Sequence, residues 1–255
     1  MMRVVLTVML AGAVLVMGVS GAHAGRTLRF ATEGAYPPFN FVGADGKLTG
    51  FDVDIGFALC KAMGVACTVV AVPWDDLIPG LQAGDYDMIV ASMAKTAERE
   101  KVVDFTDSYY HSRTTFVAGT ALKGEPFPQS LRGKILATQR NTVQAAYLVK
   151  EFGQIATVTL TEDMGGAFAL LAAGKADVVL ADSLPAYEFL ISANGKGFDF
   201  YGEALPVGDI FSSAHIAVRK RDDALRQSID KALQALRLDG TYDTINRAYF
   251  PFSIY

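Results

Sequence analysis

The chain has 255 residues, with 23 Lys plus Arg against 27 Asp plus Glu and a formal net charge of −4. This slightly acidic balance argues against nucleic acid or an anionic membrane surface as a partner. With 51% hydrophobic and 20% charged residues the chain is not of the disordered class, and its length suffices for one large domain or two lobes.

The first 24 residues have the three parts of a secretory signal peptide. Arg3 precedes an apolar run over residues 4–19, and an Ala-x-Ala site follows at residues 22–24. We therefore predict cleavage before Gly25. A retained membrane anchor is the alternative, disfavoured because the run is short for a span. Residues 25–255 contain no apolar run as long as a membrane span, so no stable membrane insertion is expected.

Strand and helix patterns alternate over the first half of the remaining chain. Strands are expected over residues 28–32, 67–72 and 88–91, with helices over 52–63 and 77–83. Asp52 is expected to cap the first helix, and Gly84 to end the second. Such βα units indicate a largely parallel sheet.

Cys60 and Cys67 are the two cysteines of the chain. They would close a short loop between the first predicted helix and the next strand. Export to an oxidising compartment favours their pairing, and two cysteines without neighbouring histidines make a poor zinc site. The sequence therefore predicts a structural disulfide and no metal site.

The pattern restarts after a proline-containing loop at residues 124–133. Strands are expected over residues 135–138, 157–160 and 176–180, and helices over 142–152, 163–173, 182–191 and 222–238. Residues 84–90 and 174–180 share a Gly-x-x-Asp turn that leads into a buried strand. This recurrence predicts two similar α/β lobes. A cleft between them, at the carboxyl ends of the strands, is where a small ligand would sit.

Residues suited to holding an amino acid follow several of the predicted strands. The chain has no G-x-S-x-G, H-E-x-x-H, P-loop or G-x-G-x-x-G signature. Arg99 instead offers a planar fork for a carboxylate, and Asp182 an acceptor for an ammonium group. Tyr36 and Trp74 could enclose an aliphatic or guanidinium side chain, with Glu33 as a second anion.

Each of these residues also has a simpler interpretation. Arg99 could pair on the surface with Glu98, Glu100 or Asp104. Asp182 could act only as a helix cap, and the two aromatic residues could belong to the core. Taken one at a time, the residues leave both interpretations open.

An ordered set of short segments runs through the whole chain. These are Tyr36-Pro37-Pro38-Phe39, Gly50-Phe51-Asp52-Val53-Asp54, Trp74-Asp75-Asp76-Leu77-Ile78-Pro79-Gly80-Leu81, Arg99 with Val103-Asp104-Phe105-Thr106, Leu171-Ala172-Ala173-Gly174-Lys175-Ala176-Asp177 and Asp239-Gly240-Thr241-Tyr242-Asp243. Together they resemble the periplasmic solute-binding proteins (family 3) of polar amino-acid ABC transporters, most closely the lysine/arginine/ornithine- and histidine-binding group. The resemblance spans residues 28–255.

The resemblance implies an α/β, two-lobed periplasmic binding protein fold of type II. Each lobe would be a mostly parallel sheet flanked by helices, and two hinge strands would join the lobes. Residues 25–113 and 209–255 would form the first lobe, and residues 114–208 the second, inserted lobe. The Cys60 and Cys67 pair is also similar to the disulfide of this group.

The resemblance further implies a role for each candidate. Arg99 would hold the α-carboxylate of the ligand, helped by backbone N–H groups, while Asp182 would take the α-ammonium. Tyr36 and Trp74 would stack on the ligand side chain, and Glu33 would meet its cationic end. The remaining expected site residues are Ala91, Ser92, Ala94, Gln139, Asn141, Thr142 and Val143, with Ser92 and Val143 supplying the N–H groups.

The implied protein is a periplasmic monomer. It would capture a polar, cationic amino acid by hinge closure and present it to the membrane permease of an ABC importer, with no cofactor and no catalysis.

Two positions depart from the pattern of the relatives. Ala94 stands where a hydroxyl would help hold the ammonium, and Val143 offers only a backbone donor. An alternative ligand is therefore an opine or another N-substituted amino acid, whose second carboxylate would reach Lys95, Asn141 or His215.

A cyclohexadienyl dehydratase-like enzyme is a second alternative, because a few proteins with this fold catalyse that reaction. Such chemistry needs a carboxylic acid in the cleft as a general acid, for which Glu33 and Asp182 are the candidates.

Overall fold

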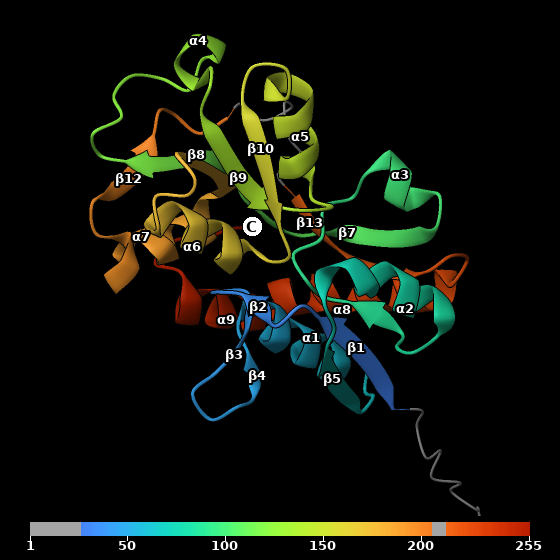
Figure 1. Ribbon diagram of the computed structural model, residues 1–255. Helices are drawn as coiled ribbons and strands as arrows, with labels where there is room; N and C mark the ends of the chain where they lie inside the picture. The colour runs from blue at the N-terminus through green and yellow to red at the C-terminus, as the bar shows by residue number, and fades with distance from the viewer. Residues whose placement is uncertain (1–26, 206–212) are drawn as a thin grey trace, which may run out of the picture.

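The chain folds into two lobes, each built on a five-stranded sheet (Figure 1). A computed structural model describes residues 27–205 and 213–255. The strand order of the first sheet is β5 (Cys67–Ala71), β1 (Leu28–Thr32), β6 (Met88–Ile89), β13 (Ser213–Arg219), β7 (Val103–His111). The order of the second is β10 (Thr157–Thr161), β9 (Ile135–Gln139), β11 (Val178–Asp182), β8 (Thr114–Gly119), β12 (Phe198–Tyr201). The predicted two-lobed α/β fold is confirmed.

The two sheets repeat one arrangement. In each, three parallel strands are followed by two strands that run antiparallel to their neighbours. In the first lobe, the Asp87 carboxylate accepts the backbone N–H of Arg29 at 2.9 Å, and the Asp87 N–H donates to the Arg29 carbonyl at 2.8 Å. In the second, Asp177 makes the same two contacts with Ile135, each at 2.8 Å. The recurring Gly-x-x-Asp turn therefore bonds the start of β6 to the start of β1 in the first lobe, and the start of β11 to the start of β9 in the second.

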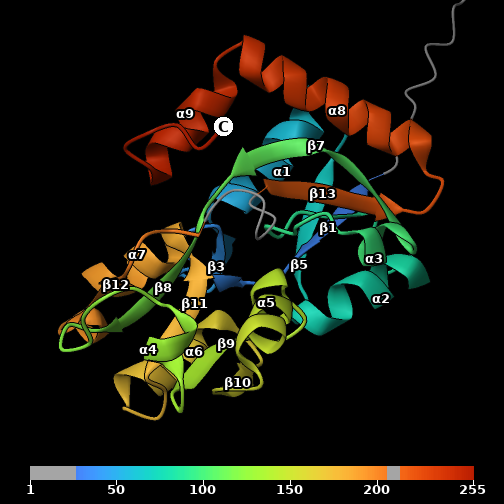
Figure 2. The same cartoon turned by 90° about the horizontal axis from the view of Figure 1, so that it is seen from above.

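Helices cover both faces of the first sheet. On one face lie α1 (Phe51–Ala62), α8 (Asp223–Leu238) and α9 (Thr241–Tyr249), as Figure 2 shows; α2 (Leu77–Ala83) packs on the other, and α3 (Ala97–Glu100) lies beside β7. Because successive strand residues point to opposite faces, Phe30 joins the core with α1 and α8, and Ala31 the core with α2.

The second sheet is covered in the same way. Helices α6 (Met164–Ala172) and α7 (Ser183–Ile191) pack on one face, and α4 (Pro128–Leu131) and α5 (Val143–Phe152) on the other. Leu136 faces the core with α5, whereas its neighbour Ala137 faces the core with α6. The carboxyl ends of the parallel strands of both sheets carry the loops that meet between the lobes.

A small sheet carries the chain from β1 into α1. Its strands are β2 (Ala35–Tyr36), β3 (Asn40–Val42) and β4 (Leu48–Thr49). The predicted disulfide is confirmed: Cys60 near the end of α1 is bonded to Cys67 at the start of β5, with their Cα atoms 6.1 Å apart.

The expectation that Asp52 caps α1 is wrong. The helix begins at Phe51, with Gly50 at the N-cap position and no side-chain cap. Asp52 lies inside the first turn with 0% of its surface exposed. Its carboxylate is not free to cap the helix, because it accepts hydrogen bonds from Asn40, Ser92 and Tyr109.

The predicted lobe boundaries at residues 113/114 and 208/209 stay predictions. The first sheet ends with β7 at His111 and the second begins with β8 at Thr114, which accords with the first boundary. The second boundary and the predicted signal peptide fall outside the described residues. Within the two described ranges, no helix is both long and apolar enough to span a bilayer.

Candidate ligand-binding site

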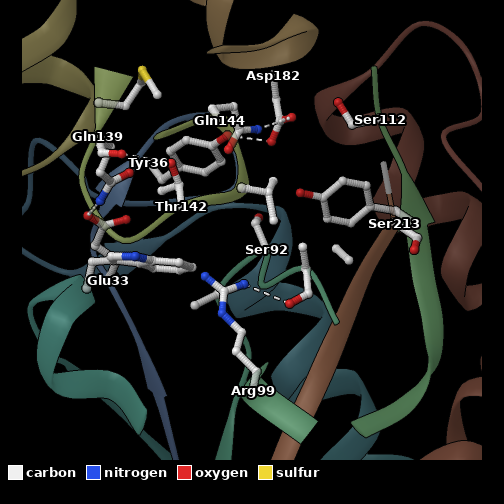
Figure 3. A pocket seen from close by; sticks show the side chains of 17 residues that line it. Glu33, Tyr36, Ser92, Arg99, Ser112, Gln139, Thr142, Gln144, Asp182 and Ser213 are labelled. Atoms are coloured by element: carbon white, nitrogen blue, oxygen red, sulfur yellow. Dashed lines mark hydrogen bonds between the residues drawn. The ribbon is translucent and has the colours of Figure 1, made fainter. Parts of the chain in front are cut away.

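A cavity lies between the lobes, with an empty volume of about 550 Å³ that includes its mouth (Figure 3). The cavity is lined by Glu33, Tyr36, Trp74, Ala91, Ser92, Ala94, Arg99, Tyr110, Ser112, Gln139, Thr142, Val143, Gln144, Met164, Asp182, Ser213 and Ala214. The strand-end loops of both sheets contribute to it, as the sequence predicts.

Every expected site residue except Asn141 lines this cavity. Sequence reasoning did not identify six other lining residues: Tyr110, Ser112, Gln144, Met164, Ser213 and Ala214. Gln144 directly follows the expected run at the start of α5, so extending that run by one residue would have found it. Ser112 and Ser213 lie where the chain passes between the lobes, and no local pattern marks them.

Arg99 projects into the cavity from the first lobe. Thr96 caps the short helix α3 by accepting the backbone N–H of Arg99 at 3.2 Å. The guanidinium donates to the carbonyl oxygens of Ala94 at 2.7 Å and Asn141 at 2.9 Å, and it lies 5.2 Å from the centroid of the Trp74 ring. Burial lowers the pKa of Arg99 to about 10, which still leaves it charged at neutral pH.

The acidic residues near Arg99 in sequence are paired with lysines instead. Glu98 contacts Lys101 at 2.6 Å, and Glu100 contacts Lys95 at 2.9 Å. Asp104 likewise contacts Lys220 at 2.6 Å. Within residues 27–205 and 213–255, Arg99 makes no ion pair at all. The simpler interpretation, a surface salt bridge, is therefore wrong.

Asp182 faces Arg99 from the second lobe, across the cavity (Figure 3). It precedes α7 but makes no side-chain cap. Its carboxylate accepts hydrogen bonds from the Tyr36 hydroxyl at 2.7 Å, the Gln144 amide at 2.9 Å and the Thr114 hydroxyl at 3.5 Å. Burial raises its pKa to about 6, although these hydrogen bonds counteract part of the shift. Asp182 is thus an acceptor at the cavity wall and no mere helix cap.

Glu33 and Gln139 meet across the lobes beside Trp74. The Gln139 side-chain amide donates to the Glu33 carboxylate at 2.6 Å and to the Glu162 carbonyl at 3.2 Å. Burial raises the pKa of Glu33 to about 7, and the charges of nearby aspartates add to this increase. A cation placed here would favour the ionised carboxylate.

The raised carboxyl pKa values connect the stability of the ligand-free protein to pH. A folded-state pKa above the unfolded value means that the folded protein binds protons more tightly. For Glu33 and Asp182 the resulting stability is fully present below about pH 4 and is lost as the pH rises through about 6 to 7. A bound cation acts in the opposite direction, because it stabilises the charged carboxylates.

A second set of contacts joins the lobes at the edge of the cavity. Asp75 accepts hydrogen bonds from the Arg140 guanidinium and, at 2.7 Å, from the Asn141 amide. The Asn141 carbonyl also accepts the Trp74 indole N–H at 3.2 Å. Asn141 has a φ of 57°, in the left-handed region, which aims its side chain and carbonyl at the first lobe. Asn141 therefore bridges the two lobes and does not line the cavity, and its expected contact with the ligand stays a prediction.

The residues expected to hold a second ligand carboxylate do not reach the cavity. Lys95 pairs with Glu100, and Asn141 is bonded to Asp75. The His215 ring contacts Ser213 and the Thr106 carbonyl, each at 2.9 Å. None of the three lines the cavity. The opine alternative therefore gains no support from the cavity lining.

The two backbone donors expected at the carboxylate differ in the structure. The Ser92 N–H already donates to the Tyr109 hydroxyl at 2.9 Å, and the Ser92 hydroxyl to Asp52 at 2.9 Å. Val143 is the first residue of α5, so its N–H has no acceptor within the helix. Of the two donors, the N–H of Val143 is the one without a hydrogen-bond acceptor among the described residues.

Two lobes of like topology, closed over a cavity with a cationic end and an anionic end, define a class of proteins that enclose a small polar solute. The chain belongs to the bacterial extracellular solute-binding proteins, family 3, whose pattern it matches over residues 28–252.

Known relatives resemble it over nearly their full length. The L-arginine-binding protein of Pseudomonas aeruginosa is 37% identical over 95% of each chain. The lysine/arginine/ornithine-binding periplasmic protein of Escherichia coli K12 is 35% identical over 90% of this chain and 89% of its own. The structure of an ancestral arginine-binding protein bound to arginine superposes with a TM-score of 0.82, at 32% identity, over 88% of this chain and 98% of that one. The predicted family is confirmed.

Proposed function

We propose that this protein captures a free amino acid with a cationic side chain, arginine foremost, in the periplasm, and presents it to the membrane permease of an ABC importer. The observation that carries the proposal is the charge arrangement of the cavity. Arg99, Asp182 and Glu33 all line the cavity. Among the described residues, Arg99 has no carboxylate partner, and neither Asp182 nor Glu33 has a cationic partner.

The α-carboxylate and α-ammonium groups of an amino acid can pair with two of these three charged side chains. The ligand carboxylate fits between the Arg99 fork and the free N–H of Val143 at the start of α5. The ligand ammonium fits against Asp182. Here Gln144 holds the carboxylate in place, which supports an unmodified ammonium despite the missing hydroxyl at Ala94.

The remaining charged residue, Glu33, selects the side chain of the ligand. A guanidinium can stack on the Trp74 ring while its N–H groups reach the second oxygen of Glu33 and the side-chain oxygen of Gln139. Because a guanidinium presents five donors in one plane, it can satisfy both acceptors at once. The compact ammonium of lysine or ornithine satisfies fewer of them, so we place these ligands after arginine.

Binding is completed by closure of the lobes. The contacts of Asp75 with Arg140 and Asn141, and of Tyr36 with Asp182, form only when the lobes meet. Ligand therefore shifts the protein toward the closed form by the contacts it adds across the cavity. Closure also excludes water, which strengthens the pairing of both ligand charges.

An enzymatic role has one observation in its favour, the pKa of about 7 at Glu33. A carboxylic acid that is partly protonated at neutral pH can act as a general acid. The two anionic side chains of the cavity, Glu33 and Asp182, however, fit a cationic amino acid better than an anionic, prephenate-like substrate. We therefore propose binding without chemistry. Loss of prephenate absorbance on incubation with the protein would contradict this.

The test is a ligand titration of protein that has first been unfolded to remove bound ligand and then refolded. Trp74 is the one tryptophan of the chain and lines the cavity, so its fluorescence reports ligand directly. The panel is L-arginine, L-lysine, L-ornithine, L-histidine, L-glutamine, L-glutamate, octopine and nopaline, with calorimetry for affinities. We expect arginine to bind most tightly. If none of the free amino acids binds and an opine does, the proposal is overturned.

A further inference from the structure

A carboxylate without a cation lies beneath the first-lobe side of the cavity. Asp52 is fully buried, and among the described residues it makes no ion pair. Burying an unpaired charge is unfavourable unless hydrogen bonds satisfy it. Asp52 does not line the cavity and does not cap its helix, so neither role explains it.

Three side chains donate to this carboxylate. One oxygen accepts the Tyr109 hydroxyl at 2.6 Å. The other accepts the Asn40 amide at 2.8 Å and the Ser92 hydroxyl at 2.9 Å. An ionised carboxylate only accepts, so all three donors must turn toward it. The charge therefore fixes the orientation of side chains from three separate segments of the first lobe.

One of these segments is the loop that follows β6. Ser92 has a φ of 53°, in the left-handed region that disfavours residues other than glycine. Two contacts hold it there: its hydroxyl donates to Asp52 and its N–H to Tyr109. The same loop brings Ala91, Ser92 and Ala94 to the cavity, and the Ala94 carbonyl accepts from Arg99.

A second cavity loop depends on the same carboxylate. Asn40 donates its amide to Asp52, which leaves its side-chain oxygen to accept the Gly34 N–H at 2.8 Å. Gly34 has a φ of 79° and forms the turn between β1 and β2. That turn carries Glu33 and Tyr36 into the cavity.

We propose that Asp52 is a positioning residue of the binding site: its buried charge holds the loops of Ser92 and Gly34 in the shapes that place Glu33, Tyr36 and Arg99 around the ligand. The proposal rests on the proposed function for its affinity readout. It explains why a carboxylate inside α1 is buried and does not line the cavity, yet connects two cavity loops.

The first test replaces the charge and keeps the shape. In Asp52→Asn the charge is lost and one acceptor oxygen becomes an NH₂ donor, so the hydrogen bonds to that oxygen must break or reverse direction. We expect arginine affinity to fall by about 10- to 100-fold, as for loss of a hydrogen bond to a charged group. Asp54→Asn is the matched control. It lies on the same helix, accepts the Tyr249 hydroxyl at 2.7 Å and does not contact the cavity, so it should change affinity by less than about twofold.

A second variant separates loop shape from general stability. Glycine adopts positive φ without strain. Ser92→Gly in the Asp52→Asn background should therefore recover part of the lost arginine affinity, because the loop no longer needs Asp52 to hold it. A loss caused only by lower stability would not be recovered. Ser92→Ala, which removes just the loop hydroxyl, supplies the affinity measurement if Asp52→Asn does not fold.

Amide hydrogen exchange of the ligand-free protein tests the proposal without any ligand. The N–H groups of Gly34 and Ser92 are both bonded within this network, so Asp52→Asn should increase their exchange and Asp54→Asn should not. Unchanged exchange at both amides in Asp52→Asn overturns the proposal. If the wild-type protein binds arginine, an unchanged arginine affinity in Asp52→Asn overturns it as well. Increased exchange in a protein that binds no amino acid supports the positioning role and overturns the proposed function alone.

Discussion

Arg99→Ala should abolish most ligand binding while leaving the ligand-free protein folded. Arg99 is the cavity's planar donor for a carboxylate, and in the described residues its partners are uncharged: two carbonyl oxygens, at 2.7 and 2.9 Å, and the Trp74 ring. The variant leaves the ligand carboxylate enclosed by the lobes and without its cation.

The magnitude follows from the enclosure of that pair. Removing one partner of a buried, hydrogen-bonded charge pair raises the binding free energy by about 2–5 kcal/mol, which is roughly a 30- to 5,000-fold loss of affinity. The free protein behaves differently. Burial lowers the pKa of Arg99, so its charge is unfavourable there, and removing this charge offsets the loss of the two hydrogen bonds and of the Trp74 contact. We expect the ligand-free Tm to stay within about 3 °C of wild type, or ~1 kcal/mol.

The assay is isothermal titration with L-arginine, supported by Trp74 fluorescence and calorimetric Tm values. Arg99→Lys keeps the charge but not the planar fork, so its affinity should lie between those of wild type and Arg99→Ala. Arg247→Ala is the control: this arginine is exposed on α9, 3.5 Å from Asp243, and does not line the cavity. Its affinity should equal that of wild type.

Retention of arginine affinity within about tenfold in Arg99→Ala would refute this reasoning, because a loss of less than about 1.4 kcal/mol is too small for a buried charge pair. A large drop in the Tm of ligand-free Arg99→Ala would refute the prediction that this variant keeps its stability, since it would mean that Arg99 stabilises the empty protein.

Three further predictions concern pH, closure and the disulfide. Between about pH 5 and 8 arginine affinity should rise with pH, because Glu33 and Asp182 ionise, while the Tm of the ligand-free protein falls; titration and calorimetry across that range check the two opposite trends. Asp75→Asn should increase the dissociation rate of arginine in stopped-flow fluorescence with little change in the association rate, because its contacts form after closure. Paired Cys60→Ser and Cys67→Ser substitutions should lower the Tm by roughly 4–8 °C, from about 2 kcal/mol, and leave arginine affinity unchanged, because neither residue lines the cavity.

Local signals predicted the helices α1, α2 and α5 to α8 and the parallel strands well, but they did not predict α3, α4 or α9. Thr142, Asp163 and Asp222 accept backbone N–H groups at the starts of α5, α6 and α8, and each of these helices begins within a residue or two of its expected start. A cap and an apolar period lie within a few neighbouring residues, so the sequence displays them directly. The antiparallel strands were not predicted. β7 pairs with β13, about a hundred residues later in the chain, and such pairing has no local pattern.

The same contrast holds in the site. The residue types pointed to an amino-acid pocket, but the roles of Asp52 and Asp182 could not be distinguished from capping. Both precede or begin an apolar helix, which is the usual pattern of a cap. Their actual partners lie far along the chain: Tyr109 is 57 residues from Asp52, and Tyr36 is 146 residues from Asp182. The contact by which Asn141 bridges the lobes was not predicted for a related reason, since its partner Asp75 lies 66 residues away in the chain.

The strand order of the first sheet has a consequence for the nascent chain. β13 separates β6 from β7, and α8 packs against α1, yet both are synthesised after the whole second sheet. The first lobe cannot complete its core until residues 213–238 exist, whereas the strands of the second are all made by Tyr201. Domains generally fold as units once their sequence is complete. The lobe that contains the first strand of the chain is therefore the later of the two to be able to fold during synthesis.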